Sequence, residues 1–274
     1  MTGCEIGKIC NGSEKERQMR PIDNYLKRLE PIKYDFARYK NYFKTRWDTF
    51  QYAMQMLENN GIELSFAKTL EIGCGSGYYL SLLSQVSTEV IGVDIAGGTA
   101  RTCEAGYANA KKLLNVTGTS NVIIRDGAME KISVEDNSID LVFSAYVLEH
   151  VMDLDAGMKE CNRVLGDKGI MVSIVPGVLD KMVYIFSRDY LKHSAFSALR
   201  PFLYLLGIKR DLEASWHFPL APWPHDVRKT FFQELNQYRL KSWLGLFHAY
   251  SHRVVDIDRC RLQDHIIISR KDLS

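Results

Sequence analysis

Apolar residues in the central part of the chain recur in two patterns. Short apolar runs predict strands, and longer stretches with apolar residues three and four apart predict helices. The two kinds of element alternate, which is typical of an α/β fold with a mainly parallel sheet and helices on both faces. In chain order, we expect strands or helices at 68–73, 78–86, 90–94, 99–115, 121–125, 139–144, 153–165 and 169–175.

The segment before this region, residues 21–60, has the spacing of an amphipathic helix, and Gly61 is placed to end it. Residues 15–46 hold ten Lys/Arg against four Asp/Glu. This local excess indicates either a solvated helix face or a surface for an anionic substrate or an acidic membrane. The apolar face of the segment comprises Tyr39, Tyr42, Phe43, Trp47, Phe50, Met54 and Leu57.

The segment after the alternating region, residues 177–225, is rich in Phe, Tyr, Leu and Trp and carries several Lys and Arg. We expect a helical cap that packs on the core and shapes a substrate pocket. The rival interpretation is an interfacial helix that contacts a membrane peripherally through 177–210. Beyond the cap, we expect a helix at 231–247 and strands at 253–257 and 264–269.

Composition narrows the class of protein without naming it. The chain is 46% apolar and 25% charged, which is ordinary for a soluble protein, and its net charge of +2 gives no case for nucleic-acid binding. Six cysteines without a C-x-x-C pair fit a reducing cytosol and argue against a zinc site or a disulfide framework. We see no apolar signal segment and no run long enough to span a membrane, and therefore expect a cytoplasmic protein.

Residues 69–77, Thr-Leu-Glu-Ile-Gly-Cys-Gly-Ser-Gly, carry the strongest functional signal. They predict a buried strand with the acid Glu71, followed by a turn with glycine at alternate positions. Glycine allows a ligand to approach the backbone closely, and the next helix offers free N–H groups at its start. A second strand ends in Asp94, about where an α/β nucleotide site places its ribose-binding acid.

This G-x-G-x-G turn, with an acid two residues before its first glycine, resembles the class I S-adenosylmethionine-dependent methyltransferases. Downstream segments of the chain match further landmarks of that family at 121–129, 136–151 and 165–175. The resemblance implies a Rossmann-like seven-stranded sheet, mostly parallel with an antiparallel last strand. It also implies S-adenosyl-L-methionine as the cofactor. The expected organisation is an N-terminal tail and helices (1–60), a cofactor-binding core (61–176), a cap (177–225) and a C-terminal helix and strands that complete the sheet (226–274).

The resemblance also implies roles for individual residues. Glu71 would lie near the methionine amino group, and Asp94 would accept hydrogen bonds from both ribose hydroxyls. Asp126 would accept from the adenine amine. The remaining cofactor-binding residues would be Gly73, Gly75 and Gly77 under the cofactor, Gly127 and Ala128 beside the adenine, and Ser144 and Tyr146 at the methionine end.

Two histidines are candidates for a general base. His150, in Leu148-Glu-His150-Val, resembles a segment that faces the acceptor in O-methyltransferases of quinone biosynthesis. Some relatives bind a divalent metal there with Glu-x-x-Glu-His, but Tyr146 holds the first position here, so no metal is expected. His225, followed by Asp226 on the loop after the cap, loosely resembles methyltransferases of sugar pathways. A structural role for His225 is an equal alternative.

The leading hypothesis is methyl transfer to oxygen on a sugar, lipid-linked or quinone-like small molecule. N- or C-methylation would need no base, and a non-catalytic cofactor-binding partner is a third hypothesis. An NAD-dependent enzyme is disfavoured by the glycine spacing, and RNA methylation by the absence of a basic net charge or a recognisable RNA-binding module. The sequence does not predict an oligomeric state.

Overall fold

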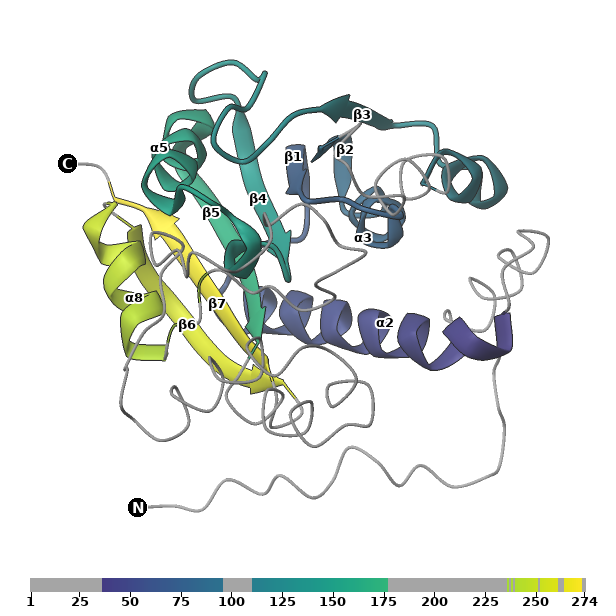
Figure 1. The fold of residues 1–274 in the computed structure, drawn as a ribbon, viewed down its shortest axis with the longest axis horizontal. Coiled ribbons are helices and arrows are strands. Elements are labelled where there is room, and N and C mark those ends of the chain that lie inside the picture. The colour runs from purple at the N-terminus through teal and green to yellow at the C-terminus, as the bar shows by residue number, and fades with distance from the viewer. Residues whose placement is uncertain are drawn as a thin grey trace, which may run out of the picture.

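The computed structural model describes residues 36–95, 110–176, 236, 238, 240–250, 252–260 and 264–272. Its helices and strands follow one another along the chain as expected for an α/β protein (Figure 1). In order they are α2 (Phe36–Asn59), β1 (Phe66–Ile72), α3 (Tyr78–Leu83), β2 (Ser87–Asp94), β3 (Val122–Asp126), β4 (Ile139–Ala145), η1 (Leu148–His150), α5 (Leu154–Val164), β5 (Leu165–Pro176), α8 (Leu240–Ala249), β6 (His252–Cys260) and β7 (Asp264–Lys271).

The strands form one seven-stranded sheet in the order β3-β2-β1-β4-β5-β7-β6. Strands β1 to β5 pair in parallel, and β7 runs antiparallel to both of its neighbours, β5 and β6. The expected mostly parallel sheet with an antiparallel last strand is therefore confirmed. The strand order reverses between β1 and β4, and ligands of open α/β sheets bind in the crevice outside the strand ends at such a point.

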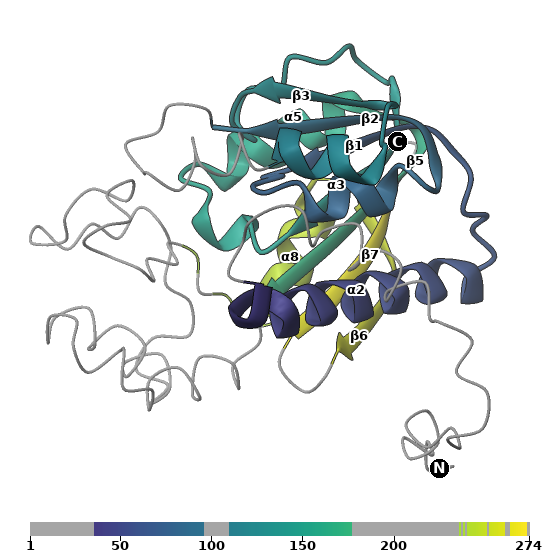
Figure 2. The same cartoon turned by 90° about the vertical axis from the view of Figure 1, so that its right-hand side faces the viewer.

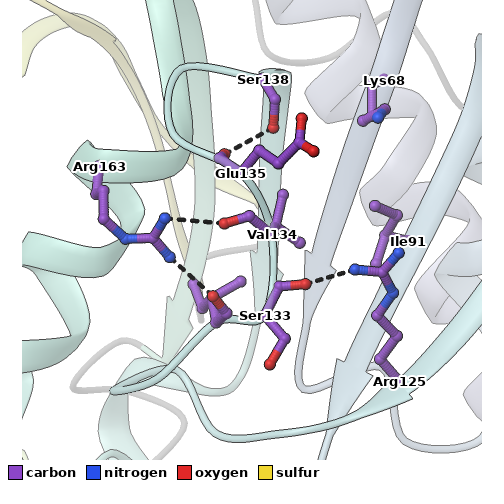
Figure 3. Close-up of a pocket in the computed structure, with 9 residues that line it drawn as sticks. Lys68, Ile91, Arg125, Ser133, Val134, Glu135, Ser138 and Arg163 are labelled. Atoms are coloured by element: carbon purple, nitrogen blue, oxygen red, sulfur yellow. Dashed lines mark hydrogen bonds between the residues drawn. The ribbon is translucent and has the colours of Figure 1, made fainter.

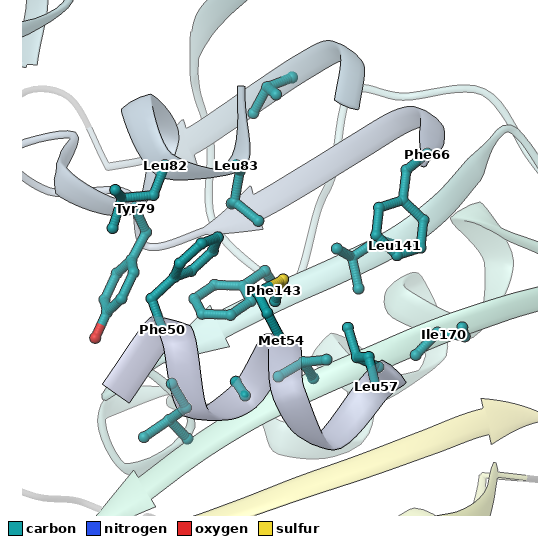
Figure 4. Close-up of a cluster of buried hydrophobic side chains, with 14 of the residues drawn as sticks. Phe50, Met54, Leu57, Phe66, Tyr79, Leu82, Leu83, Leu141, Phe143 and Ile170 are labelled. Atoms are coloured by element: carbon teal, nitrogen blue, oxygen red, sulfur yellow. The ribbon is translucent and has the colours of Figure 1, made fainter. Parts of the chain in front are cut away.

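Helices cover both faces of the sheet, with a separate apolar core on each side (Figure 2). On one face α2 packs through Phe50, Met54 and Leu57, which confirms the C-terminal part of the apolar face expected for this helix. The side chains of Tyr39, Tyr42 and Phe43 lie outside the described residues, and their part of the face stays a prediction. Figure 4 shows these side chains against Phe143 of β4 and the neighbouring strands, with Tyr79 of α3 at the same cluster. The opposite core includes side chains of α5 and α8. The sheet is thus packed between two layers of helices.

Two sequence expectations need correction. The helix expected at 231–247 begins at Leu240 instead, and Asn236 lies outside it because its backbone N–H donates to Glu149 O. Strand β5 begins at Leu165, earlier than expected, because it pairs with Ile139 across an irregularity in β4.

Several expected elements fall outside the described residues. They are the tail (1–20), the first part of the N-terminal helical region, the start of the 99–115 helix, the cap at 177–225 and the loop that carries His225. The domain boundaries that depend on them stay predictions.

Candidate active site

The glycine turn after β1 lies at the point where the strand order reverses. Gly73, Gly75 and Gly77 have φ angles of 68°, 47° and 78°, in the left-handed region that favours glycine. A Cβ on Gly73 would come 2.3 Å from Val147 Cγ2, and one on Gly77 would come 2.9 Å from Ala110 Cβ. Two of the glycines are therefore required both by their backbone conformation and by close packing, because any larger residue would displace its neighbour.

Asp94 at the end of β2 is tied to this turn. Its Oδ2 accepts a hydrogen bond from Gly75 N–H at 2.5 Å, and its Oδ1 accepts one from Ile95 N–H at 2.7 Å. Burial raises the pKa of Asp94, while the two backbone hydrogen bonds oppose the rise. Among the described residues, a Cβ on Gly75 would meet nothing closer than Asp94 Oδ2 at 3.9 Å. A ligand could therefore approach the backbone here.

Glu71 on β1 is a buried carboxyl group, only 2% exposed, between Gly92 of β2 and Phe143 of β4 in the sheet register. Its Oε2 has no hydrogen-bond partner among the described residues. Burial, followed by the charge of Asp94, raises the pKa of Glu71 well above its ordinary value. An incompletely satisfied buried acid is costly, and such groups concentrate at functional sites, where a cation can satisfy them.

Asp126, at the end of β3, lies opposite Asp94 in the sheet register and is exposed. Gly127 N–H donates to Asp94 O at 3.0 Å, which brings the segment after β3 against the end of β2. Ala128 forms an isolated bridge with Lys131. Sequence reasoning missed Ile95, a 40% exposed apolar side chain directly after Asp94, which could cover a flat ring. The sequence signal that could have identified Ile95 is its position directly after Asp94, the acid at the end of the strand.

Ser144 and Tyr146 lie at the carboxyl end of β4. Ser144 is fully buried, and its Oγ has no hydrogen-bond partner among the described residues. Successive side chains of a strand point to opposite faces of the sheet, so Ser144 and Phe143 lie on opposite faces. The side chain of Phe143 packs with α2 and α3. A role for Ser144 at the cofactor stays a prediction.

Tyr146 has a positive φ of 59°, which is uncommon for a bulky residue. Its Oη donates to Asp264 Oδ2 at 2.5 Å, and Arg46 Cζ lies 3.7 Å from the centroid of its ring. Sequence reasoning missed Arg46 and Asp264. Arg46 was counted only within a basic helix, and no local motif connects Asp264 to a residue 118 positions away.

Of the two candidate histidines, the structure describes His150 and not His225. His150 lies in η1 just after β4, with a side chain 52% exposed and Nε2 3.9 Å from Glu149 Oε1. Asn236 holds this turn, since its Nδ2 donates to Leu148 O at 3.0 Å and to Val151 O at 2.6 Å. His225 lies outside the described residues, so the structure does not bring the two histidines together.

A cavity of about 470 Å³ lies away from the glycine turn. Its lining includes Lys68 near the start of β1 and Arg163 of α5, and none of the residues expected at the site. Figure 3 shows Arg125 and Arg163 reaching the loop before β4, where they donate to the carbonyls of Ser133 and Val134. The two arginines stabilise the loop through these hydrogen bonds, and we therefore assign them a structural role.

The described part of the chain contains no cluster of three or more His, Cys, Asp or Glu that could hold a metal ion. No helix within it is long and apolar enough to cross a membrane.

A glycine turn with acids on β1 and β2, at the reversal point of a mainly parallel sheet, defines a Rossmann-like nucleotide-binding class of protein. Comparison with known proteins narrows this class. The family model described as a methyltransferase domain matches residues 70–173. A probable S-adenosylmethionine-dependent methyltransferase of Mycolicibacterium smegmatis is 33% identical over 107 residues, which are 39% of this chain and 37% of that protein. This chain thus matches well under half the length of that relative.

Two other similarities extend over most of the chain. The demethylmenaquinone methyltransferase of Staphylococcus aureus is 27% identical over 248 residues, covering 86% of this chain and 91% of that protein. The crystal structure of an S-adenosylmethionine-dependent methyltransferase from Mesorhizobium loti is similar with a TM-score of 0.54 at 13% identity, covering 82% and 97% of the two chains. That structural likeness supports the fold alone. Residues 70–173 of the chain thus match a methyltransferase domain, and the relative that shares this region is named as a probable S-adenosylmethionine-dependent methyltransferase.

Proposed function

We propose that this protein binds S-adenosyl-L-methionine and transfers its methyl group to an oxygen of a small molecule. The observation that carries the proposal is the glycine turn held to Asp94, next to the buried and incompletely satisfied Glu71. The match of residues 70–173 to a methyltransferase domain supports the same reaction class.

The residues of the site fit this cofactor. Glu71 would take the cationic amino group, which supplies the partner that its Oε2 lacks among the described residues. Asp94 would accept from the ribose hydroxyls, because a carboxylate has two acceptor oxygens for a diol. Asp126 and Ile95 would border the adenine, and Gly75 would let the ligand approach the backbone. The bound cofactor supplies an electrophilic methyl group, and the protein contributes positioning and exclusion of water.

The proposed acceptor is a sugar, lipid-linked or quinone-like molecule. A relative named for demethylmenaquinone supports a quinone-like ring. An acceptor hydroxyl must lose its proton during the transfer, and His150 and His225 are the candidates that the sequence offers for the base. N- or C-methylation, or cofactor binding without turnover, is the second candidate, and it is favoured if neither histidine matters.

We further propose a cytoplasmic protein with no nucleic-acid partner. The segment 177–210 is the candidate for peripheral membrane contact, and it lies outside the described residues.

Isothermal titration calorimetry with S-adenosylmethionine, S-adenosylhomocysteine and NAD tests the proposal. The first two should bind and NAD should not. Asp94→Ala removes charge-assisted hydrogen bonds worth roughly 1.5–3 kcal/mol each, so affinity should fall at least about tenfold. Since Asp94 also holds Gly75 N–H, circular dichroism must show that the variant is folded. Binding of NAD without any response to S-adenosylhomocysteine would contradict the assignment.

A further inference from the structure

Tyr146 is held by three separate parts of the chain. Its backbone N–H donates to Ile174 O of β5 at 2.9 Å, its Oη donates to Asp264 of β7, and its ring lies beneath the guanidinium of Arg46 from α2. A non-glycine residue persists at positive φ when its surroundings over-determine it, and such residues cluster at active sites. The position of this phenol is therefore enforced by long-range contacts.

Tyr146 follows the end of β4, which pairs with β1, the strand that leads into the glycine turn. Val147, the next residue, packs directly against Gly73 of the turn. Tyr146 packs against the apolar cluster that contains Tyr79, two residues after the turn, and Phe143 on β4, and the ring centroids of Tyr79 and Phe143 lie 5.0 Å apart. Aromatic side chains therefore lie in the cluster next to Tyr146, an environment that suits a flat ring.

We propose that Tyr146 and Asp264 form the proton path for an acceptor that is a phenolic hydroxyl. This inference rests on the proposed function and names the substrate class of the same site. Tyr146 is the catalytic residue, because its Oη would contact the acceptor oxygen. Asp264 acts through Tyr146 and is a positioning residue and proton sink.

The step balances with the groups named. As the acceptor oxygen bonds to the methyl carbon, its O–H bond breaks and the proton passes to Tyr146 Oη. The original proton of Tyr146 passes to Asp264 Oδ2. The electron pair of the broken S–C bond stays on sulfur, which leaves S-adenosylhomocysteine, the methyl ether and a protonated Asp264 that later loses its proton to water.

The charges around Tyr146 explain why the path needs both residues. Burial raises the pKa of Tyr146, and Asp264 and Tyr79 raise it further, while Arg46 lowers it. Tyr146 therefore keeps its proton at neutral pH and can accept another only while it gives its own to Asp264. A phenol, with an ordinary pKa near 10 like that of tyrosine, suits such an exchange, whereas an aliphatic alcohol is far less acidic.

Methyl transfer to two phenolic probes, protocatechuate and menadiol, tests the path in Tyr146→Phe, Asp264→Asn, His150→Ala and the native protein. Tyr146→Phe should lower kcat by about 10²-fold or more, and Asp264→Asn by at least about tenfold. Affinity for S-adenosylhomocysteine should stay within about twofold of native in both variants. The matched control is Tyr250→Phe, which loses the hydrogen bond from Tyr250 to Asp155 on the α5–α8 side and should keep native activity.

Two readouts separate proton transfer from a structural role. Activity of Asp264→Asn should recover as pH rises, because the phenol then ionises in water. In NMR spectra of protein labelled at the tyrosine ζ-carbon, the signal of Tyr146 is the one that is absent from Tyr146→Phe. This signal should shift when the native protein is acidified, and it should not shift when Asp264→Asn is acidified.

The outcomes are distinguishable. Native kcat and an unchanged pH profile in Asp264→Asn overturn the path, as does loss of activity in His150→Ala alone. If S-adenosylhomocysteine binds but neither phenol is methylated, the phenolic path is wrong while the cofactor assignment stands. If S-adenosylhomocysteine does not bind the native protein, the proposed function itself fails.

Discussion

At the scale of single residues, Glu71 is where stability and ligand binding oppose each other. Burial raises its pKa above the ordinary 4.5, so the folded protein keeps a proton that the unfolded chain releases. Stability should therefore fall as pH rises from about 4.5 to the folded pKa, and level off above it. In Glu71→Gln the side chain at this position cannot ionise. The thermal stability of the variant relative to the native protein should therefore increase as pH rises across the same window.

Thermal unfolding of the two proteins as a function of pH measures this gain. Asp94, whose pKa is also raised, titrates in both proteins, so their difference reports Glu71 together with its coupling to Asp94. Glu71→Gln should also bind S-adenosylhomocysteine more weakly and lose the increase in affinity that ionisation of Glu71 gives the native protein. A parallel pH dependence of stability in both proteins would show that Glu71 does not titrate as a buried acid.

Gly73 gives the second prediction at this scale. Gly73→Ala adds a methyl group 2.3 Å from Val147 Cγ2 at a φ of 68°, so it should disrupt the turn and abolish binding of S-adenosylhomocysteine. Gly118→Ala is the matched control, because Gly118 has a φ of 69° and nothing within 4 Å of a Cβ. It should lose about 1–2 kcal/mol of stability through backbone strain and keep its affinity. Calorimetry and urea unfolding of both variants decide between strain and steric clash.

At the scale of elements, Asn236 connects the chain beyond the cap to the turn that carries His150. Asn236→Ala leaves the carbonyls of Leu148 and Val151 without this donor, at about 1–3 kcal/mol for each buried group left unpaired. The lost stability should be accompanied by faster hydrogen exchange of His150 N–H, which is bonded to Val147 O. The side chain therefore couples the ordering of η1 to the C-terminal part of the chain.

Asn121→Ala is the control for this prediction. Asn121 Nδ2 likewise donates to two carbonyls, those of Ser84 and Ser87, but it lies just before β3, away from η1. It should lower stability in urea without changing the exchange of His150 N–H. Equal exchange in both variants would mean that Asn236 does not govern the turn.

At the scale of the whole molecule, the segment 177–225 follows strand β5 and precedes helix α8 along the chain. We predict that replacing 178–222 with a short linker abolishes methyl transfer and spares binding of S-adenosylhomocysteine. The proposed cofactor site is formed at the ends of β1, β2, β3 and β4, which do not include the segment. Calorimetry measures whether S-adenosylhomocysteine still binds, and a transfer assay measures whether methyl transfer is lost. Attachment of the native protein to liposomes through this segment, with transfer retained after its replacement, would favour the membrane interpretation.

The order of elements, the mainly parallel sheet and the positions of Glu71, the glycine turn and Asp94 were predictable because each has a local cause. The antiparallel last strand was expected only from the family resemblance. Strand and helix periods reflect which side chains must be buried, and alternate glycines reflect backbone angles that other residues avoid. Asp94 was found by its place at the end of an apolar run. These signals lie within a few residues of one another and do not depend on how the chain folds back.

The contacts around Tyr146 were decided only by tertiary structure. Pairing of β7 with β5 sets Asp264 opposite Pro176, at the same sheet edge as the end of β4. Packing of α2 then brings Arg46 over the phenol. The same holds for Asn236, which reaches residues 85 and 88 positions earlier. Such pairs leave no local pattern, because the partners are joined by sheet register and layer packing rather than by spacing along the chain.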